Sequence, residues 1–179
     1  MKQTMLVPAG SGWKEKNIGD FSGPVFSMIG EEWMLISAGA GQDWNTMTAS
    51  WGGLGVLWGK NVAFMFVRPS RYTFEFTESN DRFSLSFFGD GQRKALAFCG
   101  ANSGRDSDKA AETGLTPVSF PDGSIGFDEA VQVISCRKLY AHDFDPGAFL
   151  DPGILGASYP AGDFHRMYIG EITAYRTRV

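Results

Sequence analysis

Three short polar strings contain most of the residue types in this chain that could bind a ligand. Residues 45–51 read Asn-Thr-Met-Thr-Ala-Ser-Trp, residues 68–73 read Arg-Pro-Ser-Arg-Tyr-Thr, and residues 103–109 read Ser-Gly-Arg-Asp-Ser-Asp-Lys. Each string concentrates small hydroxyls, and the last two add cations. Such donors suit one dianionic phosphate joined to a flat polar ring. Together the strings predict a phosphate-bearing ligand.

The hydroxyls of the first string alternate along the chain. Thr46, Thr48 and Ser50 stand two residues apart, so on a strand they face the same way. Three hydroxyls in a row can bond an extended polar ligand. The same pattern also describes a solvated strand face, because threonine is a good β former. Both interpretations stay open for this string alone.

The second string combines cations with a possible helix start. Pro69 is tolerated in a first helical turn, where free N–H groups and the helix dipole favour an anion. Arg68 and Arg71 would add bidentate contacts to phosphate oxygens. The alternative is an ordinary capped helix with a surface ion pair. Phe74 and Phe76 alternate with polar residues and also fit a strand.

The third string offers Ser103, Arg105 and Lys109, with Gly104 allowing close approach of the backbone to a ligand. The alternative is a loop between two helices, whose two aspartates offset the cations.

Few residues of this chain could bind a metal ion or act as a catalytic nucleophile. The chain has two histidines, His142 and His165, and their spacing does not match that of metal ligands, so no metal is expected. Its two cysteines, Cys99 and Cys136, do not form a metal-binding pair either, and we expect both thiols to be reduced and buried. The chain lacks the Gly-x-Ser-x-Gly motif of a nucleophile elbow, which argues against a hydrolase. His165 is either a rim histidine bonded to Asp163 or a hydrogen-bond donor near a bound ring.

Length and composition predict one folded domain. The chain has 179 residues, of which 43% are hydrophobic and 20% charged. Its aromatic share of 14% fits a β-rich core or a surface buried against a second subunit. A net charge of −4 argues against a nucleic-acid partner. No run of signal-peptide or membrane-span length is found, so we expect no membrane association and a cytoplasmic location.

Most of the expected elements are strands, placed over residues 25–29, 32–38, 45–51, 62–67, 83–87, 115–120, 127–139 and 167–175. The glycines of 52–59 predict a flexible stretch, and the prolines and glycines of 143–163 predict a long functional or partner-contacting loop. This pattern favours a mainly β fold, a small barrel with helical excursions.

Two short helices interrupt the strands. One is expected over 92–98, capped by Asp90, and one over 109–113, capped by Asp106 or Ser107.

In this order the strings resemble the flavin reductase-like family of FMN-binding split barrels, and within it the flavoredoxin branch. His165, ahead of Tyr168-Ile169-Gly170-Glu171, adds to the resemblance, which spans roughly residues 22–177. It implies an antiparallel six-stranded split β-barrel domain, assigned to 22–179, and the Gly- and Lys-rich residues 1–21 before it are expected to form an N-terminal arm. It also implies a homodimer with FMN near the subunit interface, and a helix after Pro69.

The resemblance also implies roles for residues of the three strings. Those along the isoalloxazine ring and ribityl chain are Thr46, Met47, Thr48, Ala49, Ser50 and Trp51. Those at the phosphate end are Arg68, Ser70, Tyr72, Thr73, Ser103 and Lys109. His165 would be the catalytic residue, near the face where a reductant approaches.

The implied function is an oxidoreductase, an NAD(P)H-dependent flavin reductase that uses FMN, with FAD or riboflavin as further substrates. The alternative is a flavoredoxin-type electron-transfer protein with tightly bound FMN and a redox-protein partner. A third hypothesis, outside redox chemistry, is a barrel that binds another phosphorylated ligand or a partner protein.

Overall fold

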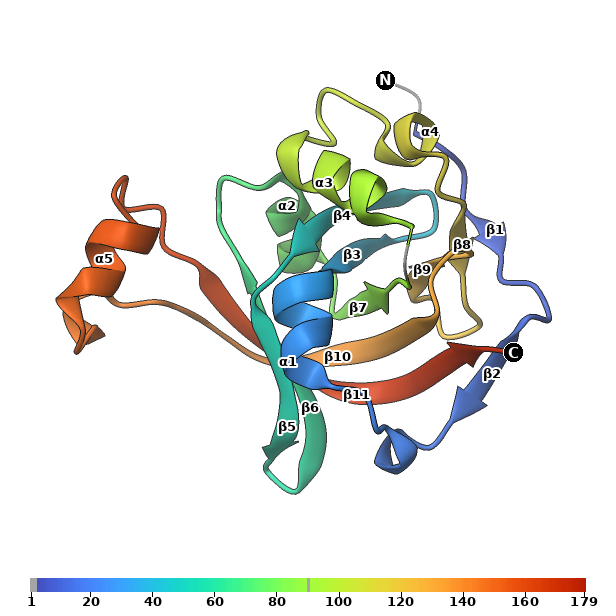
Figure 1. Ribbon diagram of the computed structural model, residues 1–179, viewed down its shortest axis with the longest axis horizontal. Helices are drawn as coiled ribbons and strands as arrows, with labels where there is room; N and C mark the ends of the chain where they lie inside the picture. Colours follow the sequence, from blue (N-terminus) through green and yellow to red (C-terminus); the bar gives the residue numbers. More distant parts are fainter. Residues whose placement is uncertain (1–2, 90) are drawn as a thin grey trace.

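One large antiparallel sheet organises the molecule (Figure 1). The computed structural model describes residues 3–89 and 91–179. Within these residues the sheet has eight strands. Its path runs through β4 (Asp43–Ala49), β3 (Met34–Ala40), β7 (Arg82–Phe87), β10 (Gln132–Asp143), β11 (Arg166–Arg178), β6 (Lys60–Val67) and β5 (Gly52–Leu57). The eighth strand, β2 (Trp13–Lys16), pairs with β11 beside this path.

The two ends of the path meet at one corner. Strands β4 and β5 are the edges of the path, yet only Ser50 and Trp51 separate them in the chain. So short a link spans no more than about 11 Å, so the sheet must curl strongly. Register shifts in β10 against β11 help it bend. No β4–β5 pairing closes a barrel within the described residues.

A smaller sheet packs beside the large one. It consists of β1 (Val7–Pro8), β8 (Pro117–Ser119) and β9 (Ile125–Phe127), with β1 parallel to β8. Through β1 and β2, parts of the expected N-terminal arm pair with the body of the protein.

Short helices fill the connections. They are η1 (Ile18–Asp20), α1 (Val25–Ser27), η2 (Met28–Glu32), α2 (Tyr72–Ser79), α3 (Arg93–Ala101), α4 (Lys109–Thr113), η3 (Pro146–Ala148) and α5 (Pro152–Ser158). In Figure 1, α5 lies on a lobe that projects away from the sheet. Among the described residues, no helix is long and apolar enough to cross a membrane.

Both faces of the sheet are buried. Along β3, Met34 and Ile36 join one apolar cluster with α2 and η2, whereas Leu35 joins a second cluster with α3, α4 and the small sheet. Burial on both sides fixes the register of the strands, because a shift by one residue would exchange the two sets.

Seven of the eight expected strands are confirmed, as β3, β4, β6, β7, β8, β10 and β11, and the helix after Pro69 is confirmed as α2. The strand expected over 25–29 is wrong, because this run is helical and buries only Met28 and Ile29. The flexible stretch expected over 52–59 is also wrong, because β5 occupies 52–57.

The two expected helices exist, with one corrected cap. Helix α4 is capped by Asp108, whose carboxylate accepts from Ala110 N and Ala111 N, and neither Asp106 nor Ser107 takes that role. The Asp90 cap of the other helix lies outside the described residues.

Candidate functional site

The three polar strings meet at the edge strand β4. Asn45 Nδ2 donates to Thr73 Oγ1 at 2.8 Å, which joins the first string to the second. Lys109 Nζ donates to the carbonyl of Thr46 at 2.8 Å, which joins the third string to the first. Gly104 lies directly against the Asn45 side chain. The folded chain therefore brings these distant segments together.

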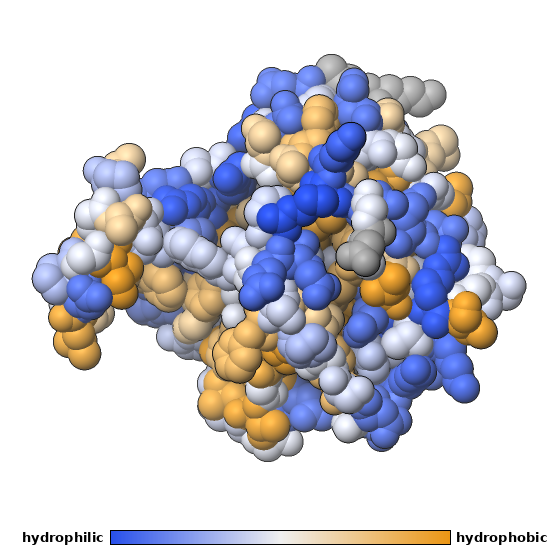
Figure 2. Space-filling view, in the orientation of Figure 1, coloured by the Kyte–Doolittle hydropathy of each residue, from blue (hydrophilic) through white to orange (hydrophobic). Residues whose placement is uncertain are grey.

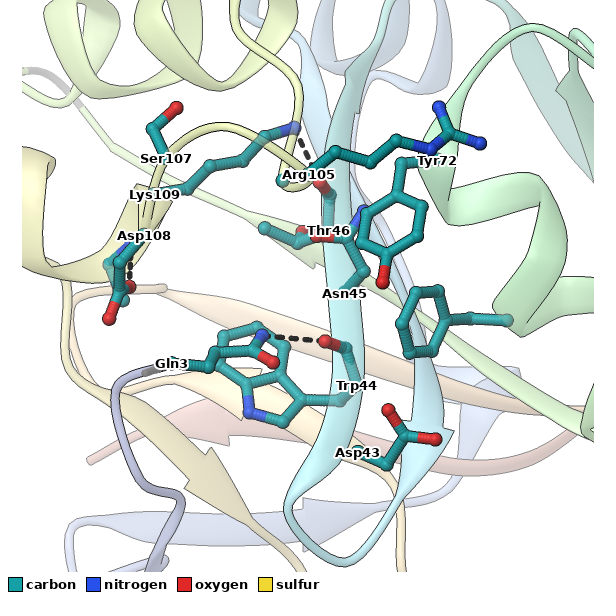
Figure 3. Close-up of a pocket in the computed structure, with 13 residues that line it drawn as sticks. Gln3, Asp43, Trp44, Asn45, Thr46, Tyr72, Arg105, Ser107, Asp108 and Lys109 are labelled. Carbon is teal, nitrogen blue, oxygen red and sulfur yellow. Dashed lines mark hydrogen bonds between the residues drawn. The ribbon is translucent and has the colours of Figure 1, made fainter. Parts of the chain in front are cut away.

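The first of two polar hollows along β4 lies at its start and is called here the Lys109 hollow (Figure 3). It measures about 150 Å³ and lies between β4, the start of α2 and the loop before α4. Arg105 and Lys109 bring cations to it, and Asp43 and Asp108 bring carboxylates. Tyr72 forms one wall, with the Arg105 guanidinium 4.7 Å from its ring centroid.

Lys109 is a buried ammonium that bridges two elements. Its side chain is 6% exposed, and Nζ donates to the carbonyls of Thr46 and Cys99, both at 2.8 Å. Burial lowers the pKa of Lys109 to about 8. An ammonium has three donors, so one remains for a ligand.

The second hollow lies at the end of β4 and is called here the His165 hollow. It measures about 170 Å³ and is lined by residues 47–51 with Phe66, Arg68, Arg71 and His165. The described residues that line it include two cations and no carboxylate, although the Asp163 carboxylate lies 3.9 Å from Arg68 Nη1. Such a hollow favours an anion or a group that becomes negative during reaction.

His165 is neutral in this setting. It is 8% exposed, and its ring lies 5.0 Å from that of Trp51. Burial lowers the pKa of His165 to about 4, and the nearby Arg68 and Arg71 act in the same direction. The bond to Asp163 weighed from the sequence is wrong, because His165 Nδ1 is bonded to the hydroxyl of Tyr159 at 2.8 Å.

Arg68 and Ser70 contact the segment that precedes His165. Arg68 donates to the carbonyls of Asp163 and Ser158, each at 2.8 Å. Ser70 Oγ donates to the Asp163 carboxylate at 2.6 Å. Both side chains therefore have protein partners that an incoming anion would have to replace.

Two of the three alternating hydroxyls serve the fold. Thr46 Oγ1 donates to the carbonyl of Ile36 at 2.9 Å, and Thr48 Oγ1 donates to that of Leu96 at 2.5 Å. Ser50 lines the His165 hollow, and its hydroxyl has no hydrogen bond within the described part of the chain.

The remaining residues of the strings divide between core and surface. Met47 and Ala49 point their side chains into the core, and Thr73 is 1% exposed. The Ser103 hydroxyl accepts from the backbone N–H of Arg105 at 3.2 Å. Because β4 is an edge strand, its outer edge still presents backbone donors and acceptors to a ligand.

A third, apolar cavity adjoins the His165 hollow. It measures about 840 Å³ and lies between α1, β5 and the projecting lobe. Ser50, Trp51 and Phe66 line both spaces, so the two share a wall. Its other walls include Phe26, Phe149 and Tyr159, among others.

The family follows from this chain's match to a family model. Residues 27–179 match the flavin reductase like domain. The chain belongs to the flavin reductase-like family. A comparison with curated protein sequences gave no significant match.

Solved structures share the fold of this flavin reductase-like chain. An FMN-binding protein from Thermus thermophilus with bound p-hydroxybenzaldehyde is 21% identical, with a TM-score of 0.64, covering 89% of this chain and 78% of that one. An NADH:FAD oxidoreductase from Streptomyces globisporus with NAD and FAD fragments is 17% identical, with a TM-score of 0.61 and coverage of 83% and 75%. Flavoredoxin of Desulfovibrio vulgaris is 20% identical, with a TM-score of 0.63 and coverage of 92% and 76%.

Sequence reasoning missed some residues of this candidate site. Arg71 and Phe66 line the His165 hollow, although neither was among the implied cofactor residues. Arg71 stood within the second string and could have been included. Tyr159 lies in the 143–163 segment, where no motif pointed to it.

Proposed function

We propose that this protein binds FMN and accepts hydride from NADH or NADPH, as a flavin reductase of the NAD(P)H:flavin oxidoreductase type. The observation that carries the proposal is the pair of polar hollows that follow one another along the edge strand β4 in a member of the flavin reductase-like family. One extended ligand with a polar ring and a phosphate could occupy both.

The donor set of the site fits such a ligand. The backbone of residues 46–51 would bond the ring edge and ribityl chain, because no strand pairs with the outer edge of β4, where Lys109 already bonds the Thr46 carbonyl. Phosphate needs cations and hydroxyls, and the proposed set is Arg68, Ser70, Tyr72, Thr73, Ser103 and Lys109. Arg71 joins this set, since it lines the same hollow as Arg68.

When bound, the isoalloxazine ring supplies the redox chemistry, taking up a hydride and passing on one or two electrons. The side chains of this protein bind, orient and stabilise. Arg68 and Arg71 favour negative charge in the His165 hollow. His165 offers a neutral donor near the face where a reductant would approach, and Trp51 and Phe66 exclude water on the apolar side.

An absorbance spectrum and a rapid-mixing experiment test the proposal. The purified protein, titrated with FMN, should show saturable binding and perturb the visible flavin bands. Under anaerobic conditions the complex should then bleach on mixing with NADH or NADPH. A protein that takes up FMN but is reduced by neither nucleotide is not a flavin reductase.

A second candidate is a flavoredoxin-type electron carrier. The structural likeness to Desulfovibrio vulgaris flavoredoxin and the exposed apolar residues around the third cavity favour it, because a redox partner needs a docking surface. This candidate predicts FMN retained through purification and reduction by a redox protein but not by nicotinamide. A colourless protein that takes up no FMN would instead favour a different phosphorylated ligand or a partner protein.

We also propose that residues 22–179 form one split-barrel domain, with 1–21 as an arm, and that two copies pair. Strong curling of the sheet supports the barrel. Exposed apolar side chains support the homodimer, since Phe26 is 96% and Leu150 is 99% exposed. The cytoplasm is the proposed compartment.

A further inference from the structure

Tyr159 and His165 form a buried pair beside the His165 hollow. The Tyr159 hydroxyl lies 2.8 Å from His165 Nδ1, and the two rings meet edge-on with centroids 5.6 Å apart. The two residues are 5% and 8% exposed. Within the described chain, Nε2 of His165 has no protein partner, and the residue lines the hollow. Nε2 is therefore the nitrogen available to a ligand.

The Tyr159 ring is held by the projecting lobe. It follows α5, and its N–H donates to the carbonyl of Leu155 at 3.0 Å. The ring stacks on Phe164 with centroids 4.8 Å apart, contacts Phe149 at 5.7 Å, and carries the Arg68 guanidinium 5.0 Å from its centroid. These contacts leave the hydroxyl little freedom to turn away from His165.

Both members of the pair are neutral near pH 7. Burial lowers the pKa of His165 to about 4, helped by Arg68 and Arg71 and opposed by Asp163. Burial raises the pKa of Tyr159, with Arg68 acting against it. Tyr159 therefore keeps its proton, and His165 has one N–H and one bare nitrogen.

Counting donors and acceptors selects one tautomer. If Nδ1 held the proton, it would donate to the Tyr159 oxygen, and the Tyr159 hydrogen would need another acceptor. The described residues provide none within hydrogen-bond reach. If Tyr159 donates to Nδ1 instead, the hydroxyl and Nδ1 satisfy each other, and the imidazole proton sits on Nε2, the nitrogen available to a ligand in the hollow.

We propose that Tyr159 is a positioning residue that fixes His165 as the Nε2–H tautomer and so presents a neutral donor to the His165 hollow. A neutral N–H suits a carbonyl or amide oxygen, whereas a phosphate is better held by Arg68 and Arg71. The identity of that oxygen, on a flavin or a nicotinamide, rests on the proposed function. The tautomer itself does not.

Nitrogen NMR of histidine-labelled protein without ligand tests the tautomer at pH 7. Wild type should show His165 with a bare Nδ1 and a protonated Nε2, and His142→Asn assigns the two histidines. Tyr159→Phe keeps the ring packing and removes the hydroxyl, so its His165 should populate both tautomers. The matched control is Tyr140→Phe, because Tyr140 stacks on His142 at 6.1 Å and should leave His165 unchanged. A protonated Nδ1 in wild type, or an unchanged Tyr159→Phe spectrum, overturns the inference.

Kinetics test the positioning role and separate it from the proposed function. With FMN and NADH, Tyr159→Phe should lower kcat about tenfold, as expected for one misdirected hydrogen bond, and change the FMN Kd less than about twofold. A wild type that binds no FMN removes the proposed function and leaves the NMR result standing. An unchanged kcat in a variant that has lost its tautomer preference overturns the positioning role.

Discussion

At the scale of single residues, Lys109 carries a charge that burial opposes. Its folded pKa is about 8 against an ordinary 10.5, so between these values the unfolded chain holds more protons. The free energy of unfolding should therefore rise with pH across this window, by on the order of 3 kcal/mol at most. Lys109→Met should lack this rise. Urea denaturation of both proteins at pH 7, 8, 9 and 10 measures it.

The comparison with Lys109→Met separates the contribution of Lys109 to the pH dependence of stability from that of other titrating groups. Burial raises the pKa of Cys99 to about 11, so above pH 9 this thiol lowers stability in both proteins. Parallel stability curves for wild type and Lys109→Met would show that the ammonium is not buried in its charged form.

At Gly104 the third string lies directly against the first. A Cβ there would overlap Asn45 Oδ1 and come within 3.2 Å of the Tyr72 ring. Gly104→Ala should therefore disturb the Asn45–Thr73 hydrogen bond, lower stability by about 1–3 kcal/mol and weaken FMN binding. Thermal unfolding and an FMN titration measure both effects. In the control Gly10→Ala, the added methyl meets nothing within 4 Å, so stability equal to this control would contradict the overlap.

At the scale of elements, the projecting lobe is held by few contacts. All of α5 is described, and none of its residues is buried. Arg68 joins the lobe to β6 through the carbonyls of Ser158 and Asp163. Lysine cannot form this two-pronged contact, so Arg68→Lys should speed amide exchange over 146–159 about tenfold, with the sheet unchanged. Mass-spectrometric hydrogen exchange measures this.

The control for this variant is Arg137→Lys, the same substitution at an arginine of β10 that pairs with Glu171 of β11 on the surface. It should leave exchange in the lobe at the wild-type rate. Lobe exchange unaffected by Arg68→Lys would mean that the aromatic contacts alone hold the segment.

The sequence predicted those strands and helices whose local hydrophobic pattern matches their burial in the folded protein. Alternation marked β7, and an apolar run marked β6. Glycines of 52–57 read as a loop, but Gly52 lies where a Cβ would meet the Phe64 carbonyl and Met34 Cε at 2.9 Å. Gly52 therefore allows close packing at the corner of the curled sheet, a tertiary requirement that no local pattern reveals.

The sequence predicted which segments form the candidate site, but it predicted the roles of their individual side chains less well. The three strings meet as expected, yet the Thr46 and Thr48 hydroxyls are bonded within the protein. Hydroxyl spacing cannot distinguish a ligand from a neighbouring carbonyl as the acceptor. Tyr159 could not be found at all, because its importance depends on how the lobe folds back onto His165.

At the scale of the whole molecule, apolar side chains gather on the face that surrounds the third cavity. Figure 2 shows them over the β5–β6 hairpin and α1, and on the projecting lobe. Phe26 is 96%, Trp58 59% and Leu150 99% exposed. Surfaces of this kind are usually covered by a partner, and a two-fold pair would cover the same face of both copies.

We therefore expect a dimer that depends on this face. Burying one large apolar side chain contributes about 1.5–3 kcal/mol, so the double variant Trp58→Ser, Leu150→Ser should raise the dimer Kd at least about 100-fold. Sedimentation equilibrium over a range of protein concentrations measures it. The control is Met5→Ser, because Met5 is 61% exposed but lies in the N-terminal residues, before β1. A wild type that sediments as a monomer would contradict the dimer, and a double variant that still pairs would place the interface on another face.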